Sequence, residues 1–419
     1  MGFGIQVDDG TEGTNQLSLS ESKRFLTLHN WQIEAVNFFW ENKGLAIMEC
    51  CTGSGKTVMA IEIIKTVLKK ENIRVLIVVP KNVILETGWY KELYDAGFGL
   101  PDIGVYYGAI KEYAKITITN MHNLKNIEMS LFDFIIFDEI HNMASRNALP
   151  YVQMEKKYKL GLTATIERHD NKHWDLFKAF DFNVFKYGAH QALVENVINE
   201  FNFFDIAVQM DEDSYEHYQI LTTQINSLIQ AGGGFNKILR GNSPYKASLL
   251  QKMGLRKQLV NNYVRKFDVV LKICLQHSKD KIIVFNEFND QTNKLYYHLL
   301  EGELKPCIYH SSMDKEKGQD NLMQYKKDKY NILLATRAVE EGYNLPKIDT
   351  GIIMACNSTK KQTIQRLGRV LRKKDKPSNL YQIYCLGTIE EQYAKERTKF
   401  FKSLCNIYNY SEYKLCDEQ

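Results

Sequence analysis

Short runs of apolar or β-branched residues recur along this 419-residue chain and alternate with stretches of helical periodicity. In the first half they occupy residues 45–48, 75–79, 116–119 and 134–137. A strand with one face in water alternates apolar and polar residues, whereas a parallel strand covered by helices on both faces is apolar throughout. The runs therefore predict an α/β lobe with a doubly wound parallel sheet that ends near Gly188.

The same alternation returns after residue 281, with runs at 282–285, 332–335 and 352–355. A second lobe of the same class is predicted there, which suggests a duplication. Between the lobes, from about residue 211 to 276, apolar residues recur at intervals of three and four, the period of an amphipathic helix. The glycines at 232–234 interrupt this pattern, so we predict a helical insertion broken by a turn.

These patterns divide the chain into five expected segments. They are a polar leader over 1–24, a first lobe over 25–208, a helical insertion over 209–277, a second lobe over 278–390 and a C-terminal helical tail over 391–419. The length agrees with more than one domain, because single hydrophobic cores rarely grow beyond about 250–300 residues.

The composition indicates a soluble protein with internal thiols. Lys and Arg number 54 against 50 Asp and Glu, a formal charge of +4 that excludes a histone-like polycation. The eight cysteines form no C-x-x-C pair, so no zinc ribbon is expected. The sequence shows neither a membrane-length apolar run nor the charged-then-apolar order of a signal peptide. We expect a protein of a bacterial, phage or viral-host cytoplasm that is not secreted.

A glycine-rich hexapeptide follows the first strand and precedes a helical stretch, the context that a phosphate loop requires. It reads Thr52-Gly53-Ser54-Gly55-Lys56-Thr57. Its glycines let backbone N–H groups turn toward a phosphate at a helix N-terminus, whose dipole favours anions. We expect Lys56 to reach the β- and γ-phosphates of ATP and Thr57 to hold Mg²⁺. Cys50 stands where the full pattern has glycine, and the alternative is a glycine turn with a surface lysine.

Two adjacent acids, Asp138 and Glu139, follow the run at 134–137 and so lie at the carboxyl end of a strand, where open α/β sheets bind ligands. We expect Asp138 to bind Mg²⁺ through its water shell. We expect Glu139 to orient and deprotonate the attacking water. Such a pair is also common as a solvated turn, but the upstream phosphate loop favours a nucleotide site.

At these residues the chain resembles superfamily-two helicases and translocases of the DEAD/DEAH type. Asp138-Glu139-Ile140-His141 resembles their D-E-x-H box, and Gln32 is similar to the upstream glutamine that recognises adenine. The stretch at 161–165 looks like the third motif, which implies that His141, Thr163, Ala164 and Thr165 couple the state of ATP to the contact between the lobes.

The second half carries two further motifs of this family. Residues 362–372 resemble the sixth motif, which implies that Arg369 and Arg372 act as fingers on the γ-phosphate and that Gln365 lies near the nucleotide. Residues 335–346 resemble the fifth motif, which implies that Glu341 and Gly342 lie near the nucleotide. Residues 360–376 hold eight basic side chains against one acidic side chain, a local charge of +7.

Within the superfamily, residues 163–170 and 365–372 are similar to the branch that contains XPB, UvsW and the motor subunits of type I and III restriction enzymes (ResIII). The resemblance implies the core motor only, with two tandem RecA-like lobes and with ATP and Mg²⁺ as cofactors. It also implies candidates for contact with a nucleic-acid backbone, each of which also fits an ordinary loop residue. They are Pro80, Lys81, Thr119, Asn120, Asn286, His310 and Thr336.

The resulting hypothesis is an ATP hydrolase that works as a DNA helicase or translocase in repair, recombination or replication. DNA is favoured as the partner, as a single strand, fork or branched duplex. The alternatives are an RNA helicase of the same motor class, the ATPase motor of an antiviral or restriction assembly, and an ATP-dependent switch. The insertion at 209–277 fits a wedge that contacts duplex and a docking surface for a protein partner equally well.

Overall fold

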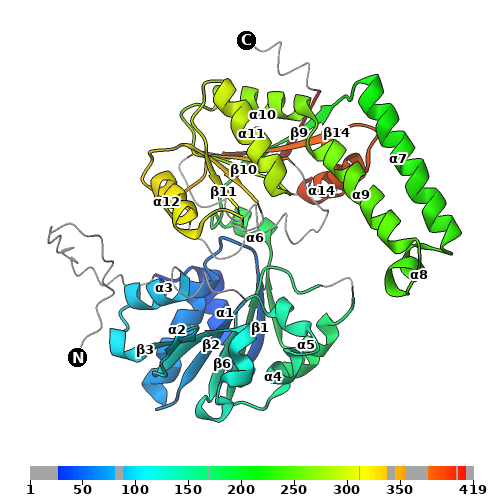
Figure 1. Cartoon of the computed structure of the whole chain (residues 1–419). Helices are drawn as coiled ribbons and strands as arrows, with labels where there is room; N and C mark the ends of the chain where they lie inside the picture. The colour runs from blue at the N-terminus through cyan, green and yellow to red at the C-terminus, as the bar shows by residue number, and fades with distance from the viewer. Residues whose placement is uncertain are drawn as a thin grey trace.

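The computed structural model describes residues 27–80, 88–167, 170–310, 312–336, 345–354, 376–402 and 404–411. Within them, two mainly parallel sheets flanked by helices form two lobes, and the chain passes between the lobes through α6 (Ala189–Val194) (Figure 1). The predicted fold class is therefore confirmed. The expected leader at 1–24 lies outside the described residues. None of the helices in the described ranges is both long and apolar enough to cross a membrane.

The first lobe contains a described sheet of eight strands in the order β4-β3-β5-β2-β6-β7-β1-β8, parallel except where β3 meets β4. Its strands are β1 (Leu45–Cys50), β2 (Val75–Val79), β3 (Ile103–Tyr107), β4 (Ile110–Lys111), β5 (Ile116–Asn120), β6 (Phe134–Phe137), β7 (Tyr158–Thr163) and β8 (Val184–Tyr187). Its α-helices are α1 (Asn30–Glu41), α2 (Lys56–Lys70), α3 (Tyr90–Asp95), α4 (Leu149–Gln153) and α5 (His173–Ala179), and its 3₁₀ turns are η2 (Leu100–Asp102), η3 (Met121–Asn126), η4 (Met129–Leu131) and η5 (Ile140–Ala144).

The strand β2 shows why the apolar runs are continuous. Successive side chains of a strand point to opposite faces of the sheet. Val75 and Ile77 enter the hydrophobic cluster shared with α1 and α2, whereas Leu76 and Val78 enter the cluster shared with α4 and α5. All five residues of β2 are buried, so both faces exclude polar side chains.

The second lobe contains a described sheet of seven strands in the order β11-β12-β10-β13-β14-β9-β15. Its strands are β9 (Phe201–Val208), β10 (Ile282–Phe285), β11 (Cys307–Tyr309), β12 (Ile332–Ala335), β13 (Thr350–Ile353), β14 (Ser378–Cys385) and β15 (Asn406–Ser411). Its helices are α7 (Glu212–Ala231), α8 (Phe235–Arg240), α9 (Lys246–Asn261), α10 (Val264–Gln276), α11 (Asn289–Glu301), α12 (Lys315–Lys326) and α14 (Ile389–Phe401).

Two expected boundaries of the second lobe are wrong. The first lobe was predicted to continue to residue 208, but β9 pairs with β14 over its whole length and belongs to the second sheet. The tail at 391–419 was predicted to be helical, but β15 follows α14 and extends the second sheet beyond β9. Sequence periodicity identifies a strand and does not identify its neighbour, which is set by non-local pairing.

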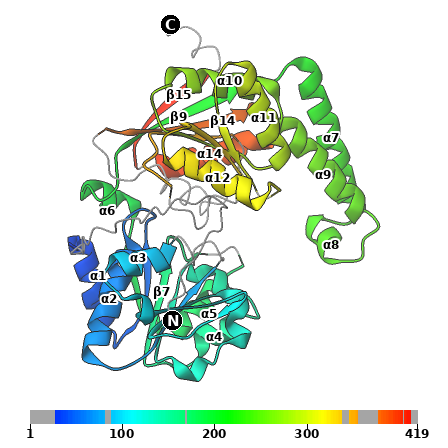
Figure 2. The ribbon, with the colours of Figure 1, turned by 60° about the vertical axis from the view of Figure 1, so that its left-hand side comes forward.

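The predicted helical insertion consists of two parts with different surroundings. Its last helix, α10, packs on the second sheet through Val270 and Ile273. The other three helices, α7, α8 and α9, form an arm that extends away from that sheet in both views (Figures 1 and 2). A small core of Ile225, Ile238 and Leu249 holds the arm together, one residue from each helix.

A buried ion pair ties α10 to α14. Lys266 is 0% exposed, and its Nζ donates to both carboxylate oxygens of Glu390 at 2.9 Å. Glu390 also accepts a hydrogen bond from the backbone N–H of Cys385, at the end of β14, at 3.1 Å. Each residue supplies the opposite charge for the other, so changing either one alone leaves a buried charge without its counter-charge.

We predict that Lys266→Met destabilises the second lobe by about 3–5 kcal/mol, because it strands the Glu390 carboxylate in the core. The double variant Lys266→Met, Glu390→Gln should recover most of the loss, since no buried charge remains. Urea unfolding of both variants measures the difference. A double variant no more stable than the single one would contradict the assignment of the loss to uncompensated charge.

Candidate nucleotide site

Three of the predicted motifs lie together at one edge of the first sheet. The phosphate loop follows β1, the acid box follows β6 and the third motif begins at the end of β7. These strands are neighbours in the order β6-β7-β1 and run parallel, so their carboxyl ends meet at the same edge. The sheet therefore brings together segments that are up to about a hundred residues apart in the sequence.

The phosphate loop makes a tight turn that requires its glycines. Gly53 has φ +84° and Gly55 has φ +95°, values in the left-handed region that residues with a Cβ rarely adopt. The Ser54 hydroxyl donates to the Cys51 carbonyl at 2.8 Å and closes the turn. The helix α2 begins at Lys56, so the loop ends at a helix N-terminus, where an anion is stabilised.

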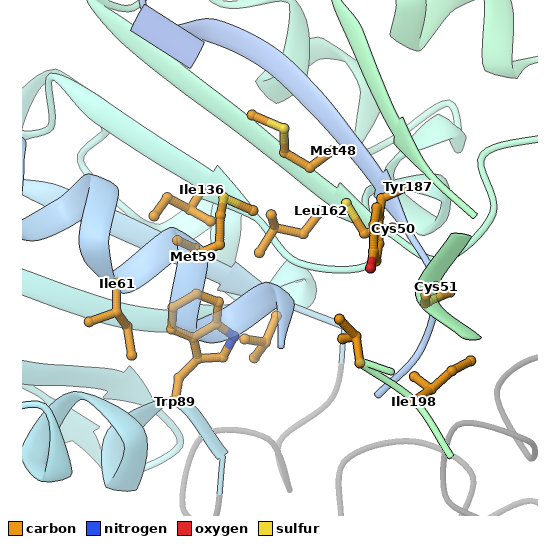
Figure 3. Packing of buried hydrophobic residues seen from close by; sticks show 14 of the residues in the cluster. Met48, Cys50, Cys51, Met59, Ile61, Trp89, Ile136, Leu162, Tyr187 and Ile198 are labelled. Carbon is orange, nitrogen blue, oxygen red and sulfur yellow. The ribbon is translucent and has the colours of Figure 1, made fainter. Parts of the chain in front are cut away.

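Lys56 lies folded over this loop. Its Nζ donates to the carbonyl of Cys50 at 3.0 Å. Cys50, which replaces the glycine of the full pattern, ends β1 with its side chain fully buried near Tyr187 (Figure 3). Burial raises the pKa of Cys50 to about 12 and also raises the pKa of Cys51, so both thiols stay neutral and add no negative charge to an anion site.

Gln32 is attached to the phosphate loop. Its Nε2 donates to the carbonyl of Gly55 at 2.9 Å, and its Oε1 accepts from the backbone N–H of His29 at 2.8 Å. A Cβ on residue 55 would come within 2.8 Å of Nε2, so this contact also depends on glycine. The structure thus places the predicted adenine-recognising residue beside the loop. The role in adenine recognition remains a prediction.

The Asp138 carboxylate is held from two sides. The backbone N–H of Glu139 donates to Oδ1 at 3.0 Å, and the indole Nε1 of Trp89 donates to Oδ2 at 2.9 Å. Burial raises the pKa of Asp138, against the Trp89 hydrogen bond and the nearby Lys56 charge, which lower it. The sequence gives no sign of the Trp89 contact, because a buried aromatic residue is expected in any core.

Glu139 adopts a backbone conformation that costs energy. Its φ is +48° and its ψ is +51°, the left-handed region, which costs about 1–2 kcal/mol for a residue with a Cβ. Such strain persists only where the surroundings impose it, and it occurs most often at functional sites. Here the turn places two neighbouring acids at the end of a single strand.

A hydrogen-bonded chain connects the acid box to the third motif. Nδ1 of His141 lies 3.3 Å from the Glu139 carboxylate and 2.9 Å from Oγ1 of Thr163. The Thr163 hydroxyl donates to the carbonyl of Thr165 at 2.8 Å, so it can only accept from His141. Nδ1 therefore carries the proton. Ala164 lies between the two threonines and is buried.

Gly161 permits this close approach. A Cβ on residue 161 would lie 2.6 Å from Cδ1 of Ile140, in the turn after the acid pair, and 3.2 Å from Ile47. Only glycine leaves room for the turn to pack against β7. The third motif is also fixed to β1, because Ile166 N–H donates to the Glu49 carboxylate at 3.1 Å.

In the second lobe, Asn286, Thr336 and His310 form a row. They follow β10, β12 and β11, which are neighbours, and Ala335 pairs with both Phe285 and Tyr309. All three side chains are buried, and neither polar side-chain atom of Asn286 bonds to another residue in the described ranges. Nε2 of His310 donates to Oδ1 of Asn293 at 3.1 Å, and burial lowers the pKa of His310.

The predicted nucleic-acid residues of the first lobe are differently placed. Pro80 follows β2 and is buried. The Thr119 hydroxyl donates to the carbonyl of Tyr106 at 2.9 Å, and Asn120 Oδ1 caps η3 by accepting from His122 and Asn123. Both of these side chains already serve the fold. Their contact with nucleic acid remains a prediction.

Six predicted site residues lie outside the described residues: Lys81, Glu341, Gly342, Gln365, Arg369 and Arg372.

The residues at the first-sheet edge fit ATP with Mg²⁺. The glycine turn and the start of α2 form an anion cradle, with Lys56 beside it. Thr57, in the first turn of α2, and Asp138 supply hydroxyl and carboxylate oxygens, the ligand type that Mg²⁺ prefers.

Comparisons with known families cover both lobes. Residues 25–168 match the family model described as "Type III restriction enzyme, res subunit", and residues 265–374 match "Helicase conserved C-terminal domain". The first match spans the phosphate loop, the acid box and the third motif. The second spans the Asn286, His310 and Thr336 row.

Whole-chain comparisons agree. The DNA 3'-5' translocase XPB2 of Sulfurisphaera tokodaii is 25% identical, over 94% of this chain and 89% of that protein. The DNA 3'-5' helicase XPB of Kineococcus radiotolerans is 24% identical over 89% of this chain, which spans only 62% of that longer protein. The Hef helicase domain of Pyrococcus furiosus has the same fold, with a TM-score of 0.62, 17% identity, and coverage of 87% of this chain and 97% of that one.

The two family matches, the whole-chain relatives and the shared two-lobe fold agree with the motifs. The chain belongs to the superfamily-two helicases, a family of ATP-hydrolysing enzymes, in the branch of XPB and the ResIII restriction subunits.

Proposed function

We propose that this chain is a DNA-stimulated ATPase that translocates along DNA and unwinds or branch-migrates it in repair, recombination or replication. The observation that carries the proposal is the meeting of the phosphate loop, the acid box and the third motif at the carboxyl edge of one sheet, in a chain that has a second lobe of the same class. The relatives named as DNA translocase and DNA helicase favour DNA over RNA as the partner.

In this proposal each side chain of the first lobe has one task. Lys56 leaves the Cys50 carbonyl to bind the β- and γ-phosphates of ATP, while Gln32 holds the loop beside the base. Thr57 and Asp138 hold Mg²⁺, which neutralises phosphate charge when it is bound. Glu139 accepts a proton from the attacking water as its general base. His141 transmits the position of Glu139 to Thr163 and the third motif.

The second lobe completes the site. Arg369 and Arg372 stabilise charge on the transferring γ-phosphoryl group, an effect worth about three to five orders of magnitude in rate. Glu341, Gly342 and Gln365 are proposed to bind the nucleotide together with these arginines. Closure of the lobes around ATP and their opening after hydrolysis then move the second lobe relative to the first.

Asn286, His310 and Thr336 are proposed to contact the nucleic-acid backbone. They lie in a row at the carboxyl edge of the second sheet, and Asn286 has two unpartnered polar atoms among the described residues. An unsatisfied buried amide costs about 1–3 kcal/mol, and a phosphate or sugar oxygen bound at this edge offsets that cost. Contacts to the backbone suit a motor, because they do not depend on sequence.

The arm is proposed to contact duplex DNA. From Gly232 to Asn261 the chain has six basic residues and no acidic residue, whereas α7 and its cap carry Asp211, Glu212, Asp213 and Glu216. The positive charge is therefore concentrated on the α8–α9 side, where Lys237, Arg240 and Lys246 are exposed. A phosphate backbone is the partner that this asymmetry favours over an uncharged protein surface.

Glu139→Gln should lower the ATPase rate by about 10²–10⁴-fold, because the general base is removed while the shape of the site is kept. Nucleotide affinity should stay near that of the wild type, whereas Lys56→Ala should lose it. Steady-state ATPase rates and binding of a fluorescent ATP analogue separate the two effects. An unchanged turnover in Glu139→Gln would show that another group activates the water.

The polymer dependence of the ATPase tests the choice of DNA. We expect stimulation by single-stranded, forked or branched DNA above the rate without polymer, because closure of the lobes requires a bound strand. The same assay with RNA of matched length and sequence is the control. Stimulation by RNA alone would replace the DNA translocase with an RNA helicase, and no stimulation by either would favour an ATP-dependent switch.

Neutralising the arm with Lys237→Ala, Arg240→Ala and Lys246→Ala should weaken binding to duplex DNA. Each lost phosphate contact lowers the slope of log affinity against log salt by about 0.9, so the slope should fall by about 3. Fluorescence anisotropy at several salt concentrations measures this.

A matched control removes three exposed cations from the first lobe, Lys69, Lys172 and Lys178. The control should bind duplex DNA with the slope of the wild type. If both triple variants keep the wild-type slope, the arm does not bind DNA, and docking of a protein partner becomes the better explanation of its charge.

A further inference from the structure

Packing fixes the direction of the Trp89 side chain. Trp89 is 2% exposed and belongs to the hydrophobic cluster that also contains Met59, Ile61 and Ile136 (Figure 3). A buried indole cannot turn without displacing these neighbours, so the direction of its N–H is set by the core. Buried Trp N–H groups usually find a partner, and here the partner is the Asp138 carboxylate at 2.9 Å.

This bond limits how the Asp138 carboxylate can rotate. Oδ2 accepts from Trp89 and Oδ1 accepts from the Glu139 backbone, so one donor holds each oxygen. The backbone donor is adjacent in the chain and moves with Asp138. Trp89 comes from a separate segment, 49 residues away, and is therefore the contact that fixes the carboxylate relative to the rest of the lobe.

The same ring also links Asp138 to α2, the helix that begins at the end of the phosphate loop. Met59 and Ile61 lie in α2, whose first two residues are Lys56 and Thr57. Trp89 packs in the cluster that contains these α2 residues, and it bonds to Asp138. One rigid side chain therefore connects the helix that carries Thr57 with Asp138, the two residues proposed to hold Mg²⁺. Outer-shell partners of this kind typically change metal affinity or activity by about 10–100-fold when they are removed.

We propose that Trp89 is a positioning residue that holds the Asp138 carboxylate in the orientation needed for Mg²⁺–nucleotide binding. The inference rests on the proposed function in that it assumes a nucleotide in the phosphate loop. It adds a residue that contacts neither nucleotide nor metal and acts through Asp138.

The test compares Trp89→Phe, which keeps an aromatic ring and removes the donor, with Trp40→Phe as a matched control. Trp40 lies in α1 and contacts Tyr158 and Lys70, and neither contact involves the acid box. Electron paramagnetic resonance with Mn²⁺ in place of Mg²⁺, in the presence of a non-hydrolysable ATP analogue, measures metal affinity without turnover. We expect Trp89→Phe to weaken Mn²⁺ binding about 10–100-fold, with nucleotide affinity in EDTA within about twofold of the wild type.

Mn²⁺ affinity of Trp89→Phe within about twofold of that of Trp40→Phe would overturn the proposal. A loss of nucleotide affinity in EDTA as well would also overturn it, because the defect would then not be specific to metal. If the wild type binds Mn²⁺–nucleotide but hydrolyses no ATP, the proposed function is wrong. The positioning role is then still decided by the comparison of Mn²⁺ affinity between Trp89→Phe and Trp40→Phe.

A second measurement does not depend on the folding of Trp89→Phe. The chain has four tryptophans, so ¹⁵N labelling gives four indole N–H resonances, three of which Phe substitution at residues 31, 40 and 174 assigns. The remaining Trp89 resonance should shift in Asp138→Asn and on addition of Mg²⁺ with the ATP analogue. A Trp89 resonance that responds to neither change would overturn the proposal.

Discussion

Parallel pairing of strands buried on both faces is the constraint on which the rest of this structure depends. Because β6, β7 and β1 run in the same direction, their carboxyl ends meet, and every chain segment that leaves them starts at the same edge. The phosphate loop, the acid box and the third motif lie close together because of that geometry. The second sheet repeats it with β11, β12 and β10, which places Asn286, His310 and Thr336 in one row.

The edge of the first sheet carries strained or crowded backbone that the core beneath it supports. Gly53 and Gly55 take left-handed conformations, Glu139 takes one at a cost, and Gly161 leaves no room for a Cβ. Beneath these turns β6 is buried throughout, and β1 and β7 are buried except at Leu45, Glu49 and Tyr158, so the strands supply the rigidity that holds the turns in place. The least favourable local conformations therefore occur where the proposed chemistry requires precise orientation.

The connection between the lobes starts at the same site. Tyr187, at the end of β8, stacks on Trp31 with ring centroids 4.5 Å apart, and its carbonyl accepts from the N–H of Cys51 at 2.9 Å. Its hydroxyl donates to Glu195, just beyond α6, at 2.8 Å. One residue thus contacts Cys51 just before the glycine turn, the residue beside Gln32 and the segment that leads to the second lobe.

The sequence by itself determined the fold class, the phosphate loop and the acid box, because local periodicity and short motifs with fixed spacing specify them. The tertiary structure alone decided that β9 and β15 join the second sheet, that Thr119 and Asn120 serve the fold, and that Trp89 holds Asp138. The reason is physical: strand neighbours and buried hydrogen bonds join residues far apart in the chain, and their spacing in sequence carries no period. A buried tryptophan looks the same in sequence whether its N–H meets a carboxylate or not.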